Sequence, residues 1–160
     1  MLLSFVLLGI YWVGHNNIFQ HVLKHDRFML WLNILFLLVS ALIPYGAGML
    51  IHHSNAQIAH VIYAGALAVG DVLLDLIWWY ATYNRHLMCD TVTPELIKAF
   101  HFRILTGSLL YVVAIAVSFV SLPVTKTVMG LAVIYYLLPT AQDLLHNKQL
   151  GKASERAQLN

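Results

Sequence analysis

The chain has 160 residues, of which 60% are hydrophobic and only 10% are charged. Soluble domains are about 45–50% apolar and about 25% charged, so this composition excludes an ordinary soluble domain and indicates an integral membrane protein. The formal net charge of +2 gives no sign of nucleic-acid binding, and the single cysteine, Cys89, allows no disulfide within the chain.

Five apolar runs separated by polar breaks predict an all-α integral membrane protein with five transmembrane helices. A spanning helix needs roughly 20 apolar residues, within a range of about 17–25, and the first run is only just long enough. The runs lack the period-two alternation of a membrane barrel. The expected spans are about residues 2–19, 28–51, 58–80, 94–122 and 123–145, in a transmembrane domain of residues 1–146 followed by a polar cytoplasmic tail of residues 147–160.

The distribution of Lys and Arg predicts the topology. With five spans, eight of these residues fall on one side of the membrane and only Lys126 falls on the other. The positive-inside rule then places the C-terminus in the cytoplasm and the N-terminus outside. One more helix ahead of Met1 would restore a six-span protein with its N-terminus inside, so we expect that one helix is missing. The eight basic residues are Lys24, Arg27, Arg85, Lys98, Arg103, Lys148, Lys152 and Arg156.

Two strings then indicate a family. Residues 4–16 read SFVLLGIYWVGHN and residues 30–38 read LWLNILFLL. They resemble the second and third helices of prokaryotic members of the endosomal–lysosomal potassium channel family, also called the transmembrane protein 175 family. Residues 78–81, 93–95 and 136–139 resemble later parts of the family more loosely, so the resemblance covers about residues 2–139.

The resemblance implies a six-helix channel subunit of which this chain holds helices two to six. In the family, the first helix carries the string Arg-x-x-x-Phe-Ser-Asp, which is absent here. That helix lines the pore and forms an apolar ion constriction, so no pore-lining residue is expected in this chain. The resemblance further implies potassium as the permeant ion, a homotetramer, and a bacterial inner membrane. A truncated gene, a wrongly assigned start and a helix supplied by another chain all remain open.

Three polar residues are candidates for docking the missing helix. Trp12 and His15 share a face of the first span with Leu8 and Phe19. An indole N–H and an imidazole can serve polar groups of a neighbouring helix, although an interfacial Trp–His pair would also explain them. Asn33 in the second span could bridge helices through its amide, or lie among the headgroups.

Two acids, Asp71 and Asp75, lie one turn apart within the third span. A carboxylate at the bilayer centre costs about 2.5–3.5 kcal/mol on insertion scales, so both need an explanation. They form either a cation or proton site, or hydrogen bonds to a neighbouring helix, and the second explanation is favoured.

The remaining motifs are interpreted as structural. Pro44, Gly46 and Gly48 are expected to end the second span, so Tyr45–Gly48 (YGAG) is not a potassium filter, which presents carbonyls from a Thr-Val-Gly-Tyr-Gly loop. The nine histidines complete no ligand set with Cys or carboxylates, so no metal is expected. The sequence holds no phosphate loop, nucleophile motif or zinc motif, so neither a cofactor nor an enzyme is expected.

The sequence therefore favours a potassium channel subunit of the apolar-constriction type that lacks its pore helix. Two alternatives stay open: a small proton-coupled transporter that uses Asp71 and Asp75, and a nonconducting accessory membrane subunit.

Overall fold

The computed structural model describes residues 2–84, 87–89 and 92–138, which form five helices. Apart from one isolated β-bridge, these residues contain no strand, so the predicted all-α fold with five helices is confirmed. The helices are α1 (Leu2–Phe19), α2 (Arg27–His52), α3 (Gln57–Tyr83), α4 (Pro94–Ser118) and α5 (Leu122–Leu137).

The helix bounds follow the apolar runs closely except at the last hairpin. The predicted fourth span of residues 94–122 was too long, because α4 ends at Ser118 and a turn over residues 119–121 precedes α5. Of the described helices, α2, α3 and α4 are long and apolar enough to cross a membrane, and α5 is a shorter apolar helix. The end of the predicted fifth span and the tail of residues 147–160 lie outside the described residues, so the division at residue 146 stays a prediction.

The expectation that Pro44, Gly46 and Gly48 end the second span was wrong. Helix α2 continues through Pro44 to His52. Proline is tolerated inside transmembrane helices because local adjustments satisfy the backbone groups that it frees. Gly46 has a packing role instead: a Cβ built on it would lie 3.2 Å from the Tyr63 ring, so the glycine lets α2 approach α3 closely.

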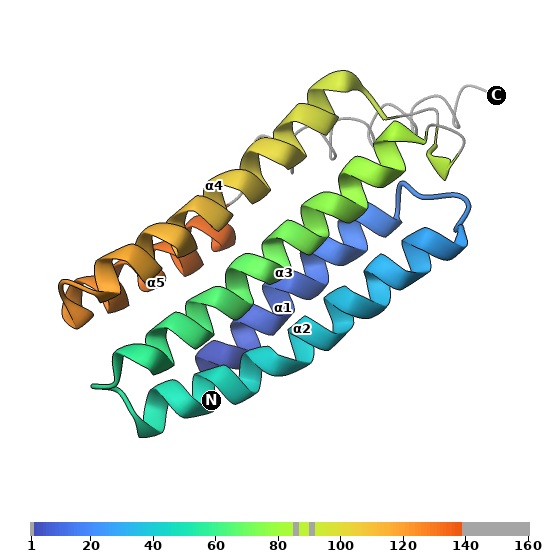
Figure 1. Cartoon of the computed structure of the whole chain (residues 1–160). Coiled ribbons are helices and arrows are strands. Elements are labelled where there is room, and N and C mark those ends of the chain that lie inside the picture. Colours follow the sequence, from blue (N-terminus) through green and yellow to red (C-terminus); the bar gives the residue numbers. More distant parts are fainter. Residues whose placement is uncertain (1, 85–86, 90–91, 139–160) are drawn as a thin grey trace.

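Helix α3 lies between α2 and α4, and each of these neighbours runs antiparallel to it (Figure 1). Its buried residues recur every three or four positions, which is the pattern of a helix with one packed stripe. Helix α1 packs against α2 and α3, while α5 runs back along α4 and reaches α1 and α3. The buried stripe of α3 consists of Ala59, His60, Tyr63, Ala64, Leu67, Gly70, Asp71, Leu74, Ile77, Trp78 and Ala81.

The connections after α1 and α3 are joined at one end of the bundle. Leu23 N–H donates to the Leu87 carbonyl at 2.8 Å, and Cys89 N–H donates to the His21 carbonyl at 3.0 Å. We call this end, where α1 and α3 finish and α2 and α4 begin, the bridged end. It carries the exposed Lys24, whereas Lys126 follows the turn at the opposite end.

Candidate functional site

The predicted docking residues His15 and Asn33 bind each other. His15 Nε2 donates to the Asn33 side-chain oxygen at 2.7 Å, which joins α1 to α2. The His15 ring also stacks on Phe19 and Phe36, with centroid distances of 4.3 and 5.2 Å. These two polar residues therefore brace the α1–α2 pair from within the chain.

Trp12 lies in a different environment from the other two. Its side chain is 64% exposed, although its ring lies 6.2 Å from that of His15. It borders a hollow of about 380 Å³ between α1 and α2, which we call the α1–α2 hollow. Ser40 lies in this hollow, and its Oγ is buried without a hydrogen-bond partner among the described residues. The hollow is lined by Phe5, Leu8, Gly9, Tyr11, Trp12, Phe36, Leu37 and Ser40.

Asp71 is the centre of a buried polar contact between α3 and α5. The residue is only 2% exposed, and its Oδ2 accepts a hydrogen bond from the Tyr136 hydroxyl at 2.7 Å. The Tyr136 carbonyl accepts from Arg103 Nη2 on α4 at 2.8 Å. Beside this contact, the Tyr11 hydroxyl donates to the Leu67 carbonyl at 2.6 Å, one turn before Asp71. Tyrosines therefore satisfy polar groups in the middle of α3 from two other helices.

Two helix glycines make room for these tyrosines. A Cβ built on Gly107 would lie only 1.8 Å from the Tyr136 hydroxyl oxygen, and one on Gly70 would lie 2.9 Å from the Tyr11 ring. Real Cβ contacts are essentially never shorter than 3.0 Å. The Tyr136 side chain therefore fits into the notch at position 107 only because glycine has no Cβ. Sequence reasoning missed this pairing, because nothing in the local pattern couples a glycine of α4 to a tyrosine of α5.

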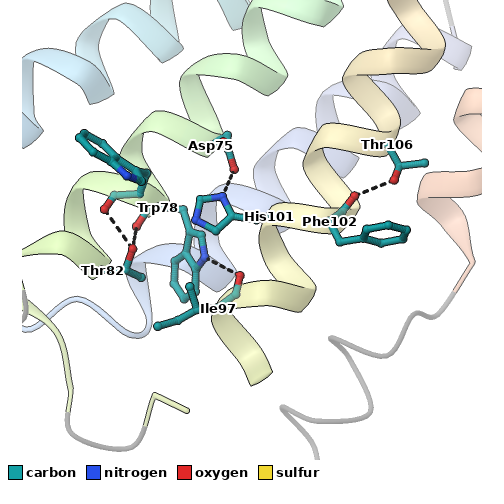
Figure 2. Close-up of polar contacts among 8 residues, drawn as sticks. Asp75, Trp78, Thr82, Ile97, His101, Phe102 and Thr106 are labelled. Carbon is teal, nitrogen blue, oxygen red and sulfur yellow. Dashed lines mark hydrogen bonds and ion pairs between the residues drawn. The ribbon is translucent and has the colours of Figure 1, made fainter. Parts of the chain in front are cut away.

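Asp75 binds a different helix. His101 Nδ1 on α4 lies 2.6 Å from Asp75 Oδ1, and both side chains are partly exposed (Figure 2). One turn away, the Trp78 indole N–H donates to the Ile97 carbonyl at 3.3 Å (Figure 2). The two acids are therefore held by separate helices rather than converging on one site.

A second cavity, of about 440 Å³, opens between α1 on one side and α4 and α5 on the other. We call it the lateral groove. Its lining is mostly apolar, and Asp71 and Arg103 supply its charged side chains.

Neither a metal centre nor a carbonyl filter is formed by the described residues. No three of their His, Cys, Asp and Glu side chains lie close enough together to hold a metal ion. The string Tyr45–Gly48 lies inside α2, where its backbone is helical and does not form an extended loop.

Comparisons with known proteins agree on one family. Residues 1–44 match the family model described as endosomal/lysosomal potassium channel TMEM175. A potassium channel of Streptomyces collinus is 31% identical over 137 residues, which cover 83% of this chain and 66% of that protein. The crystal structure of a lysosomal potassium-selective channel TMEM175 homologue from Chamaesiphon minutus has a TM-score of 0.73 at 27% identity. That match covers 84% of this chain and 69% of the other. The chain therefore spans about two thirds of the length of these relatives.

Proposed function

We propose that this chain, which belongs to the endosomal/lysosomal potassium channel TMEM175 family, is a subunit of a potassium-conducting membrane channel. The family consists of channels and not of enzymes, and the chain is a multi-pass membrane protein. The names of its bacterial relatives support potassium as the permeant ion. In this proposal the subunits assemble as a homotetramer in a bacterial inner membrane, with the C-terminus in the cytoplasm.

The proposed conduction pathway contains no carbonyl filter. A filter replaces the hydration shell of potassium with carbonyl oxygens from an extended loop. The Tyr45–Gly48 string supports the proposal that this channel works differently, because carbonyls inside α2 accept hydrogen bonds along the helix. We infer an apolar constriction that gates by dewetting, which is one of the designs open to a pore without a carbonyl filter. In this proposal the constriction lies on a helix outside α1–α5.

The observation that carries the proposal of a separate pore-lining helix is the α1–α2 hollow. It is apolar, it borders the exposed indole of Trp12, and Ser40 Oγ lies within it unpaired. A buried hydroxyl without a partner costs about 1–3 kcal/mol, so a helix that supplies one polar group here would be stabilised. We therefore place the pore-lining helix along this hollow, where Trp12 and Ser40 contact it. The hydrogen bond between His15 and Asn33 supports this arrangement by holding α1 on α2.

Potassium flux from liposomes tests the proposed function. The purified chain is reconstituted alone and with the first helix of a bacterial relative fused ahead of Leu2. We expect flux from the fused protein only, since the five helices supply the channel wall and not the neck. Flux of equal size from the bare chain would contradict the proposal, because the pore would then be built from α1–α5. A fused protein that folds and stays silent would favour the nonconducting accessory subunit.

One observation supports a second candidate, proton coupling at the intramembrane acids. Asp71 is buried, lines the lateral groove, and could exchange a proton. A chicken relative, 21% identical over 139 residues, carries the name endosomal/lysosomal proton channel TMEM175. Changing Asp71→Asn and Asp75→Asn separates the two candidates. Both variants should keep potassium flux in the fused protein, whereas a proton-coupled transporter would lose pH-driven uptake.

A further inference from the structure

The lateral groove has the dimensions of a small-molecule site. Its volume of about 440 Å³ falls within the range of about 300–1,000 Å³ that is usual for ligand pockets. Its α1 wall runs from Val6 to Asn17, which is about 17 Å at 1.5 Å per residue. The groove is open at its side, because Val13 in this wall is 56% exposed. A molecule dissolved in the bilayer can therefore enter it from the side.

The carboxyl group of Asp71, which lines this groove, uses little of its hydrogen-bonding capacity. Its Oδ2 accepts a hydrogen bond from the Tyr136 hydroxyl at 2.7 Å. The Tyr11 hydroxyl also lies in the groove wall, but it donates its single proton to the Leu67 carbonyl. The other oxygen, Oδ1, therefore accepts no hydrogen bond from the residues that the structure describes. An ionised carboxyl group has about four acceptor sites, so most of these sites are unused.

The Oδ1 atom of Asp71 also keeps some contact with the groove. In the described part of the chain, four side-chain atoms are fully buried without a partner, and Asp71 Oδ1 is not one of them. Since this oxygen has no partner either, part of its surface is open, and the lateral groove is the cavity that Asp71 lines. The four buried atoms are Ser40 Oγ, Gln57 Nε2, His60 Nε2 and Tyr111 Oη.

Among the described residues, no neighbouring cation compensates the charge of Asp71. The ion pair that they form joins His101 to Asp75. Arg103 lines the groove as well, but its Nη2 donates to the Tyr136 carbonyl, and no ion pair joins it to Asp71 in this part of the chain. A buried carboxylate is costly unless it is paired. The groove therefore contains an acid that lacks both a second donor and a counter-charge.

We propose that the lateral groove binds a lipophilic amine, with its ammonium group at Asp71 Oδ1 and its apolar chain along Ile10 and Gly14. An alkylammonium is charged at pH 7, as a lysine side chain is, and it supplies both the donor and the positive charge that Asp71 lacks. An alcohol supplies a donor alone. An anion would be repelled by Asp71, and the guanidinium of Arg103 is already engaged. Binding at this site does not require that the chain conducts potassium.

Equilibrium binding of radiolabelled octylamine to the purified full chain, in micelles of an uncharged detergent at pH 7, tests the proposal. We expect saturable binding of one octylamine per chain, with octanol and octanoate as weak competitors. Asp71→Asn should weaken binding roughly ten- to a hundredfold, the effect of losing a hydrogen bond to a charged group, while its amide oxygen still accepts from Tyr136. Asp75→Asn is the matched control and should leave binding unchanged, because Asp75 is held by His101 outside the groove.

A second pair of variants tests the position of the site. Gly14→Leu places a side chain in the groove, and it should fold, because a Cβ at this position meets the Leu74 side chain at an ordinary 3.7 Å. This variant should abolish binding. Gly130→Leu should leave binding unchanged, since Gly130 lies outside the groove and nothing lies within 4 Å of a Cβ there. Far-UV circular dichroism checks helicity, and if Asp71→Asn does not fold, the two glycine variants and the competition decide the question.

Several results would overturn the proposal. A parent chain that shows no saturable octylamine binding would do so directly. Octanol or octanoate that competes as well as unlabelled octylamine would mean that Asp71 does not select the ligand. An equal loss of binding in Asp71→Asn and Asp75→Asn would mean that only the general charge of the bundle attracts the amine. Binding that is unchanged in Gly14→Leu would place the amine outside the groove.

Discussion

The notch at Gly107 gives the sharpest prediction about the stability of the fold. In the Gly107→Ala variant the new methyl group would lie 1.8 Å from the Tyr136 hydroxyl oxygen and 2.3 Å from its Cζ. The tyrosine must leave the notch, and its hydrogen bond to Asp71 is lost with it. Overpacking of this kind costs about 1–3 kcal/mol and a lost hydrogen bond about 1 kcal/mol. We expect the free energy of unfolding to fall by about 2–4 kcal/mol.

A double-mutant cycle with SDS-titrated unfolding measures this effect. Tyr136→Ala removes the side chain that collides, so Gly107→Ala should cost almost nothing in that background and the coupling energy should be large. Gly130→Ala is the matched control, since nothing lies within 4 Å of a Cβ at that glycine. It should not lower stability, and helix propensity alone should raise it by up to about 1 kcal/mol. A cost for Gly107→Ala that is the same with and without Tyr136 would refute the packing described for this notch.

Three further predictions concern the other contacts between helices. His15→Leu and Asn33→Leu should each lower the free energy of unfolding by about 1 kcal/mol or more, because each leaves the other side chain without its hydrogen-bond partner. The double variant should cost less than the sum of the two, since it leaves no unpaired group; additive costs in SDS titration would contradict this hydrogen bond. Asp71→Asn should stay within about 1 kcal/mol of the parent, since an amide oxygen still accepts from Tyr136, whereas Asp71→Leu should cost more; equal thermal stability of the two variants would argue against the contact. Gly70→Ala should cost about 1–3 kcal/mol by displacing the Tyr11 ring, and Tyr11→Leu should relieve it; a neutral Gly70→Ala variant would mean that α1 packs differently.

The sequence was sufficient for the helices and for most of their bounds. Apolar length alone places α1 and α3, and the Thr93–Pro94 start of α4 is a local signal, because Thr93 caps the helix through Leu96 N–H. The expectation for Pro44 was wrong because proline usually ends a helix in a soluble protein, whereas transmembrane helices tolerate it, and α2 continues through it. The end of α4 was misplaced because the residues of the 119–121 turn are themselves apolar.

The candidate site was harder to predict, because its contacts join residues far apart in the chain. Asp71 and Asp75 were recognisable as acids that need partners, but Tyr136 lies 65 residues from Asp71. Likewise, His15 and Asn33 were recognisable as polar helix residues, but periodicity does not tell that they bind each other. Ser40 became informative only when the structure placed its hydroxyl, unpaired, in the α1–α2 hollow.

Disulfide crosslinking tests directly where the pore-lining helix docks on this chain. In the fused protein with Cys89→Ser, a cysteine is placed at successive positions of the added helix and paired with either Ser40→Cys in the α1–α2 hollow or Val13→Cys in the lateral groove. We expect disulfides to Ser40→Cys at positions one helical turn apart, and none to Val13→Cys. Disulfides to Val13→Cys with none to Ser40→Cys would contradict this placement, because the pore helix would then occupy the lateral groove and not the α1–α2 hollow.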